Sequence, residues 1–418
     1  MKAGFDCDAL VIGAGPAGSA TAILLAQAGW RVVLVEQHTY PRRKVCGECI
    51  AGGNLALLDG LGIGPAFGAE AGPELQRLGW MDATTTVSAD MPRCAQSRHP
   101  FGRALGRERL DSLLLERAHA LGVTIMQPAR VLKVSGELGG FACKVTAHAD
   151  GRHHTLHMPV VVDAHGSWER GPVLNGDGEH KTSASDRRPR RNGDLLAFKA
   201  NFSGSRLGSG YLPVLALRGA YGGLVLADRG RLTLACCIRR DRLSALRRAQ
   251  PHATAGIAVE VFLRSSSPGV RDALDGAERE GAWLAVGPLR PGVRLGALRG
   301  PFLVGNAAGE CHPLIGEGIS MALQSAVMLG DLLIRQPPRE IAGQHAADLH
   351  RAYTAAWRRK FTPRLRLAAI FAHIAMRPLL AGAARRFLAV RPALLGDAAR
   401  LAGKTASGAL PKPTAEST

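Results

Sequence analysis

The sequence predicts an α/β protein in which an interrupted parallel-sheet domain carries an inserted antiparallel sheet and is followed by helices. Three observations predict this arrangement. A strand, a glycine-rich turn, a helix and a second strand open the chain; strand-like segments alternate over roughly 195–285; and a strand, a Gly-rich loop and a helix return after residue 301. With 418 residues, 46% of them hydrophobic, the chain is long enough for two or three domains.

The first unit is the segment DALVIGAGPAGSATAILLAQAGWRVVLVE, which ends at Glu36. A short apolar strand runs into Gly13-x-Gly15-x-x-Gly18, and a helix and a second strand follow. In a nucleotide-binding βαβ unit the first glycine permits the tight turn, the second lets the backbone approach a pyrophosphate, and the third lets helix and strand pack closely. Glu36 lies 18 residues after Gly18, where an acid can accept hydrogen bonds from a ribose. The segment therefore predicts a dinucleotide site.

The next segments continue this domain. We expect a helix near 54–61, an amphipathic helix over 105–122, an apolar strand within 158–168, and strands of a small hairpin layer at VTIMQP, RVLKVSG and FACKVTAH. The predicted domains are a nucleotide-binding domain over 1–80, 101–168 and 286–345, a substrate domain over 81–100 and 195–285, basic C-terminal helices over 346–405, and a flexible tail over 406–418.

Charge and cysteine content narrow the class of protein. The net charge is +19, but no nucleic-acid-binding module is recognisable, so we expect no nucleic-acid partner. The spacing of the eight cysteines suggests neither a disulfide framework nor a zinc site, and we expect no metal. The N-terminus resembles no signal peptide, and no segment reaches the roughly 18 consecutive apolar residues of a membrane span. We expect a cytoplasmic protein, reduced at its thiols.

Four separated segments resemble the flavoprotein monooxygenase superfamily, which also holds geranylgeranyl reductases, flavin halogenases and lycopene cyclases. They are GAGPAG with Glu36, PRRKVCGE, GRERLD and VGNAAGECHPLIGEGI, and they span about three quarters of the chain. The resemblance implies a split Rossmann-like FAD-binding domain with an inserted antiparallel β-sheet substrate domain and a C-terminal helical region. It also implies FAD as the cofactor, with NAD(P)H as a transient electron donor or a separate reductase in its place.

The same resemblance assigns FAD contacts residue by residue. Asn306 stands where the usual pattern has Asp, so its amide replaces a carboxylate near the ribitol. The helix that begins at Gly318 and Ile319 offers backbone N–H groups to the negative charge of reduced flavin. The expected cofactor-binding residues are Gly13, Gly15, Ala17, Gly18, Glu36, Lys44, Cys46, Gly47, Arg107, Val131, Asn306, Gly318 and Ile319.

The segment KVCGEC contains Cys46-Gly47-Glu48-Cys49. Geranylgeranyl reductases have a similar Lys-x-Cys-Gly segment in the loop that passes over the flavin. The resemblance implies that Cys46 faces the cofactor or substrate, and we expect Cys49 to be a helix residue without a redox role. A Cys46–Cys49 dithiol that relays electrons to the flavin is the alternative.

Three reactions fit the family resemblance. The first, which we favour, is hydroxylation of an aromatic or lipophilic, polyketide- or isoprenoid-like substrate through a flavin C4a-hydroperoxide. The second is reduction of isolated double bonds, as in geranylgeranyl reductases, and the third is a redox-neutral cyclisation of the lycopene-cyclase type. Halogenation is disfavoured because the Trp-x-Trp-x-Ile-Pro segment of many flavin halogenases is absent.

Two further expectations concern catalysis and partners. His312 is a titratable group beside the expected flavin and, with Cys46, is the candidate catalytic residue. From Arg358 to Lys404 the only acid is Asp397, and apolar runs lie between the basic residues. These helices either pack on the core with a solvated basic face or lie on anionic lipid, peripheral to the inner membrane face.

Overall fold

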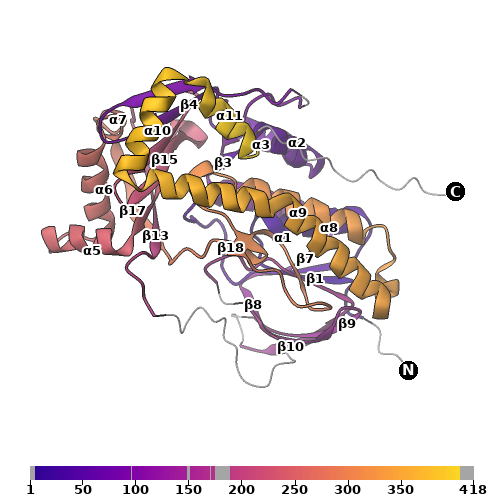
Figure 1. Ribbon diagram of the computed structural model, residues 1–418. Helices are drawn as coiled ribbons and strands as arrows, with labels where there is room; N and C mark the ends of the chain where they lie inside the picture. Colours follow the sequence, from indigo (N-terminus) through magenta and orange to yellow (C-terminus); the bar gives the residue numbers. More distant parts are fainter. Residues whose placement is uncertain (1–4, 96, 148–150, 170, 175–188, 405–418) are drawn as a thin grey trace.

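The computed structural model describes residues 5–95, 97–147, 151–169, 171–174 and 189–404. The expected flexible tail, 406–418, lies outside these residues. Figure 1 shows a parallel-sheet domain, a second sheet domain beside it, and a long C-terminal helix that runs across both. Helices and sheets alternate as an α/β fold requires, and the parallel domain is interrupted, as predicted.

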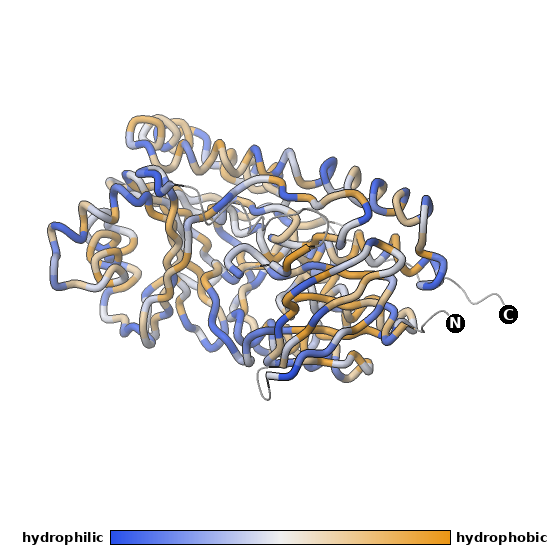
Figure 2. The backbone as a smooth tube through the Cα atoms, turned by 90° about the horizontal axis from the view of Figure 1, so that it is seen from below, coloured by the Kyte–Doolittle hydropathy of each residue, from blue (hydrophilic) through white to orange (hydrophobic). Residues whose placement is uncertain are grey.

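The parallel sheet has the strand order β19-β11-β1-β2-β7. Its strands are short and apolar because they are covered on both faces, which is typical of parallel sheets. Figure 2 shows hydrophobic segments gathered in the interior of the molecule and hydrophilic residues at many of its outer turns. The register pairs Ile12 with Val35 and with Asp163, so the carboxyl ends of three strands meet at one edge. Bounds are β1 (Ala9–Ile12), β2 (Val32–Val35), β7 (Thr124–Met126), β11 (Val160–Asp163) and β19 (Phe302–Leu303).

Helices α1 (Pro16–Gln27), α4 (Arg107–Ala120) and α8 (Gly318–Leu333) pack together beside this sheet. The segments expected at the FAD therefore come from distant parts of the chain but meet at one end of the domain. The prediction for VTIMQP was wrong in one respect: it forms β7, which pairs with β2 in the parallel sheet and not with the hairpin layer. There it forms the edge strand, and its three residues are exposed or only partly buried.

The hairpin layer has the order β10-β9-β8-β12. Its strands are β8 (Ala129–Glu137), β9 (Gly140–Ala147), β10 (His153–Met158) and β12 (Val173–Leu174). Val131, an expected FAD contact, is buried on β8.

The second domain is a seven-stranded sheet of order β17-β13-β16-β15-β14-β4-β5. β4 pairs in parallel with β14, so this sheet begins at Arg77, ahead of the expected boundary at residue 81. One face is covered by α5 (Arg240–Ala249), α6 (Ala255–Ser266) and α7 (Pro268–Ala273). Strand bounds are β4 (Arg77–Met81), β5 (Thr86–Asp90), β13 (Leu195–Ser203), β14 (Tyr211–Leu217), β15 (Ala220–Leu226), β16 (Leu232–Arg239) and β17 (Glu278–Val286).

The C-terminal helices cover the other face of that sheet. α9 (Gly343–Ala375) runs through Pro363 without a break, while Pro378 opens α10 (Pro378–Val390) and Pro392 precedes α11 (Ala393–Leu401). Proline is tolerated at the first turn of a helix, where its missing N–H has no partner to lose. α9 and α10 meet at 102°. Among the described residues, no single helix combines the length and apolar character of a membrane span.

Short elements connect the two domains. Cys49 lies on β3 (Cys49–Ile50), which pairs with β6 (Arg103–Ala104), so the expectation of a helix residue was wrong. The helix begins three residues later as α2 (Gly52–Gly60), and α3 (Gly64–Glu70) follows. A two-stranded pairing of Gly292–Val293 with Gly309–Glu310 joins the substrate domain to the last FAD segment.

Candidate FAD and substrate site

A single cavity of about 840 Å³ lies between the carboxyl edge of the parallel sheet and the second sheet. Twelve of the thirteen expected cofactor-binding residues line it, which brings four distant sequence segments together. They are Gly13, Gly15, Ala17, Glu36, Lys44, Cys46, Gly47, Arg107, Val131, Asn306, Gly318 and Ile319. Gly18 is not a lining residue.

The glycines fit a nucleotide cradle. Gly13 has a φ of +97°, and a Cβ there would lie 2.7 Å from the carbonyl oxygen of Ala164. A Cβ on Gly18 would overlap the carbonyl oxygen of Gly13, so Gly18 serves the packing of helix on strand. Gly15 is the N-cap of α1 and has no side-chain cap within the described residues. The N–H groups of the first turn are thus open to a diphosphate.

Glu36 directly follows β2 and is buried. One carboxylate oxygen accepts from the backbone N–H of Ala14 at 2.8 Å, and the other accepts from that of His38 at 2.9 Å. These two bonds fix the carboxylate at the cavity wall. Each carboxylate oxygen has more than one lone-pair site, so Glu36 can also accept from ribose hydroxyl groups.

Arg107 supplies a cation beside Gly15. Its guanidinium forms two bonds to Asp111, at 2.8 and 2.7 Å, and lies 3.7 Å from where a Cβ on Gly15 would stand. Burial lowers the pKa of Arg107, but the neighbouring Asp111 carboxylate raises it by more. The net effect is a raised pKa, so the guanidinium is charged. Lys44 lies 3.9 Å from the same carboxylate, and burial lowers its pKa. This arrangement suits an anionic diphosphate.

At the other end, α8 points its N-terminus at the cavity. Gly318 and Ile319 are its first residues, and within the described residues no side chain caps them. The free N–H groups and the positive end of the helix dipole stabilise negative charge there. Asn306 lies close by and its amide donates to the hydroxyl of Ser167 at 2.9 Å. FAD fits this set of features: the glycine cradle, the buried Glu36, the Arg107 cation and the uncapped N-termini of α1 and α8.

The Cys46–Cys49 loop is tied to the second sheet by Glu48. This side chain is fully buried, and its carboxylate binds the buried Lys199 of β13 and accepts from Thr233 of β16 at 2.5 Å. It also accepts from the backbone N–H of Arg107 at 3.0 Å. Glu48 has a φ of +59°, a conformation that costs a non-glycine residue on the order of 1 kcal/mol. The carboxylate contacts hold the loop over the cavity in spite of that cost.

The two cysteines of this loop differ. Cys46 is half-buried, lines the cavity, and its sulfur accepts from the backbone N–H of Glu48 at 3.3 Å. Cys49 is buried, and burial raises the pKa of its thiol. Both thiols are free. A thiol kept protonated is a poor nucleophile, which disfavours a Cys46–Cys49 dithiol relay.

His312 lies behind the cavity wall and is not a lining residue. Its Nδ1 is 2.9 Å from the hydroxyl oxygen of Tyr221, which is buried and does line the cavity. Burial lowers the pKa of His312 to about 4, so the ring is neutral at pH 7. His312 can therefore act on a substrate only through Tyr221.

Sequence reasoning missed several residues at the site. His165 lines the cavity next to Gly13 and is 2.6 Å from Asp163; burial lowers its pKa, but Asp163 raises it more. The sequence did contain a signal for His165. Asp163 ends an apolar strand and His165 follows it, and ligands bind outside the carboxyl ends of the strands in such sheets. Lys199 and Lys404 gave no local signal, because their contacts join segments that lie far apart in the sequence.

The walls away from the cradle are apolar. They come from β4, β14 and β15 of the sheet and from the three C-terminal helices. Examples are Trp80, Phe371, Ile374 and Leu388. Among the described residues, no group of three or more His, Cys, Asp and Glu side chains could hold a metal ion.

Residues 6–174 match a family described as an FAD binding domain. This part of the chain, about two-fifths of its length, is therefore an FAD-binding domain. The match covers the first two segments of the flavoprotein's split FAD domain, and the last segment closes the same cavity.

Two curated relatives and two solved structures are similar to this flavoprotein. It is 29% identical over 163 residues to menaquinone reductase of Mycobacterium tuberculosis, covering 39% of each chain. It is 32% identical over 187 residues to 3-hydroxybenzoate 6-hydroxylase 1 of Aquipseudomonas alcaligenes, covering 42% of this chain and 44% of that one. The chain thus spans about two-fifths of the length of these relatives.

Among solved structures, it is similar to the myxobacterial chondrochloren halogenase CndH, with a TM-score of 0.72 and 18% identity over 95% of this chain and 91% of that one. It is also similar to PqsL of Pseudomonas aeruginosa, a probable FAD-dependent monooxygenase, with a TM-score of 0.64 and 19% identity over 95% and 99%. At these identities the likeness shows the fold.

Proposed function

We propose that the protein is an FAD-dependent monooxygenase that hydroxylates an aromatic or lipophilic, polyketide- or isoprenoid-like substrate. One observation carries the proposal: the cavity that holds the FAD cradle continues into a chamber walled by apolar side chains. Bound FAD, reduced by NAD(P)H or by a separate reductase, supplies the electrons that activate O₂. Substrate, O₂, two electrons and two protons then give hydroxylated substrate and water.

The chain's own residues have separate roles in this proposal. Arg107, Lys44 and the N-terminus of α1 bind the diphosphate, and Glu36 orients the ribose. Gly318 and Ile319 offer N–H donors to the charge that develops on reduction. The Cys46–Cys49 loop, held by Glu48, covers the cofactor.

The apolar chamber binds and orients the substrate. Trp80 of β4 and Leu388 of α10 are among the side chains that line it. An apolar ring or chain gains about 25 cal/mol for each Å² that these walls remove from water. The same walls keep bulk water away from the reaction. Tyr221, a lining residue bonded to neutral His312, offers a hydroxyl group that can exchange a hydrogen bond with a substrate oxygen.

Reduction of isolated double bonds is the second candidate. It is favoured by the similarity to menaquinone reductase over 163 residues and by Cys46-Gly47 at the cavity. In this reaction the electrons of reduced FAD go to the substrate, which gains two hydrogen atoms. No O₂ is consumed.

Turnover with and without oxygen separates the two candidates. The FAD-loaded protein would be supplied with NAD(P)H or a chemical reductant, and with a panel of lipophilic phenols and polyprenyl quinones. A monooxygenase consumes one O₂ for each product and stops when oxygen is removed. A double-bond reductase continues under anaerobic conditions, and that outcome would overturn the first proposal.

A further inference from the structure

Helix α10 presents an apolar face to solvent. Leu379, Phe387 and Val390 are 89%, 62% and 80% exposed, although large apolar side chains are usually buried. Together with Ala383 they follow a spacing of four, four and three residues, which places them on one side of a helix. This set of four residues is called the α10 stripe below.

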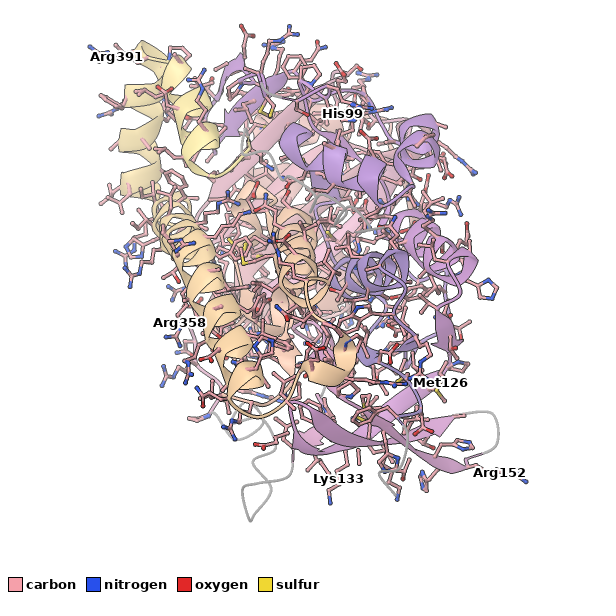
Figure 3. All side chains as sticks on the ribbon, turned by 90° about the vertical axis from the view of Figure 1, so that its right-hand side faces the viewer. His99, Met126, Lys133, Arg152, Arg358 and Arg391 are labelled. Carbon is pink, nitrogen blue, oxygen red and sulfur yellow. The ribbon has the colours of Figure 1, made fainter. Side chains whose placement is uncertain are left out.

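Basic side chains surround the α10 stripe. Arg377, Arg386 and Arg391 are exposed, and within the described residues none of the three has an ion pair. From Arg358 to Lys404 the sequence holds eleven Lys and Arg residues and one acid. Figure 3 shows the side chains of Arg358 and Arg391 directed away from the body of the protein. An apolar helix face bordered by arginines is typical of helices that lie in the headgroup region of a bilayer.

The inner face of the same helix lines the cavity. Ala384 and Leu388 are lining residues, so α10 forms part of the wall between the chamber and solvent. Phe387 belongs to both surfaces: it lines the cavity and is 62% exposed. The α10 stripe is therefore continuous with the apolar chamber at Phe387.

We propose that α10 docks on an anionic lipid surface and that a lipophilic substrate passes from the bilayer into the chamber beside Phe387. The claim that α10 docks on lipid does not depend on the proposed function, whereas the claim that substrate passes beside Phe387 rests on it. Charge favours lipid as the occupant. Unpaired arginines around an apolar stripe complement anionic headgroups. Each arginine near such a surface contributes about 1 kcal/mol to the free energy of membrane binding. The bend of 102° sets α10 crosswise at the end of α9, where a flat surface can reach it.

Docking is tested with the full FAD-loaded chain and sedimented vesicles. We expect binding to vesicles that contain phosphatidylglycerol, weaker binding to pure phosphatidylcholine, and release by high salt. The variant L379D/V390D removes two residues of the stripe that do not line the cavity, and we expect at least tenfold weaker binding. V261D is the matched control, since Val261 is 45% exposed on α6, which covers the opposite face of the second sheet from α10. It should bind as the wild type does.

Two outcomes would overturn the docking proposal. One is no sedimentation with phosphatidylglycerol vesicles at low salt, which would leave the stripe as a surface for a protein partner. The other is equal loss of binding in L379D/V390D and V261D. Both results are independent of whether the protein turns over any substrate.

Passage is tested by the length of the substrate chain. L379D/V390D should slow turnover of a long-chain phenol presented in vesicles at least severalfold and leave a short-chain, water-soluble analogue unaffected. If the wild type and L379D/V390D turned over the long-chain phenol at equal rates, passage beside α10 would be overturned. Absence of product from either phenol would instead contradict the proposed function and leave the vesicle-binding result standing.

Discussion

Lys404 Nζ lies 3.6 Å from Oε1 of Glu317 and 3.4 Å from the carbonyl oxygen of Gly316. The last described residue of the chain thereby reaches the N-terminus of α8, where the reduced flavin would carry its charge. Both side chains are buried. Burial raises the pKa of Glu317 against the opposing effects of Lys404 and Arg364. The C-terminal segment is therefore part of the site and closes it from one side.

Breaking this pair should destabilise the fold. K404M leaves the Glu317 carboxylate buried with only Arg364, at 3.8 Å, to compensate it. We expect the free energy of unfolding to fall by about 3 kcal/mol, because the buried carboxylate loses the nearer of its two cations. Urea unfolding followed by tryptophan fluorescence measures this. The double variant E317Q/K404M should recover most of the loss, and a double variant no more stable than K404M would contradict the assignment.

Arg107 should be needed for FAD retention. R107M removes the buried cation beside Gly15, and we expect FAD affinity to fall about 10- to 100-fold, the effect of one or two charge-assisted hydrogen bonds. Fluorescence titration of the apoprotein with FAD gives the affinity. R109M is the control: Arg109 lies on the same helix and forms a similar two-bond pair with Glu70, away from the cavity. Equal effects of the two variants would exclude a special role for Arg107.

N306D should bind FAD more tightly. The amide of Asn306 donates to Ser167, and a carboxylate at this position can accept from Ser167 and from ribitol hydroxyls together. We expect a gain of about 3- to 10-fold in affinity, in line with about 1 kcal/mol for the net contribution of one hydrogen bond. The same FAD titration checks it. An affinity that stays constant or falls would show that residue 306 does not face the ribitol.

Lys199 should hold the loop over the flavin. K199M leaves Glu48 buried without its cation, and we expect a loss of about 3 kcal/mol in unfolding free energy together with weaker FAD binding. Thermal unfolding with and without added FAD measures both effects. K133M serves as the control because Lys133 is exposed on β8. If K199M lowered stability and left FAD binding unchanged, the pair would be structural only.

His312 should make stability depend on pH in acid. The folded protein takes up this proton only near pH 4, whereas the unfolded chain takes it up near pH 6.5. Between these values the unfolded state binds more protons, so stability falls as the pH falls. Relative to H312N, the wild type should lose about 2 to 3 kcal/mol between pH 7 and pH 4. Urea unfolding of both proteins at these two pH values measures the difference, and parallel losses would contradict a buried neutral His312.

The FAD cradle could be predicted from the sequence because its signals are local. A strand, three glycines, a helix and Glu36 lie within one stretch of chain, and each residue type has a backbone or charge reason to be there. The predicted residues therefore line one cavity, apart from Gly18, which packs.

The rest of the site depends on contacts between distant segments. Nothing near Lys199 or Lys404 indicates that they bind Glu48 and Glu317. His312 shows the opposite error: its position next to the Gly-rich loop suggested direct contact with the flavin, but its ring turns to Tyr221 behind the wall. Cys49 was assigned to a helix because the apolar helix follows so closely, and the pairing of β3 with β6 overrides that local preference.

Isotope incorporation tests the central claim most directly. The FAD-loaded protein would turn over a lipophilic phenol with reductant under ¹⁸O₂, and the product would be analysed by mass spectrometry. The account predicts one ¹⁸O atom in each product molecule, with the second atom released as water. A product that gains two hydrogen atoms and no ¹⁸O would contradict it and establish the flavoprotein as a double-bond reductase.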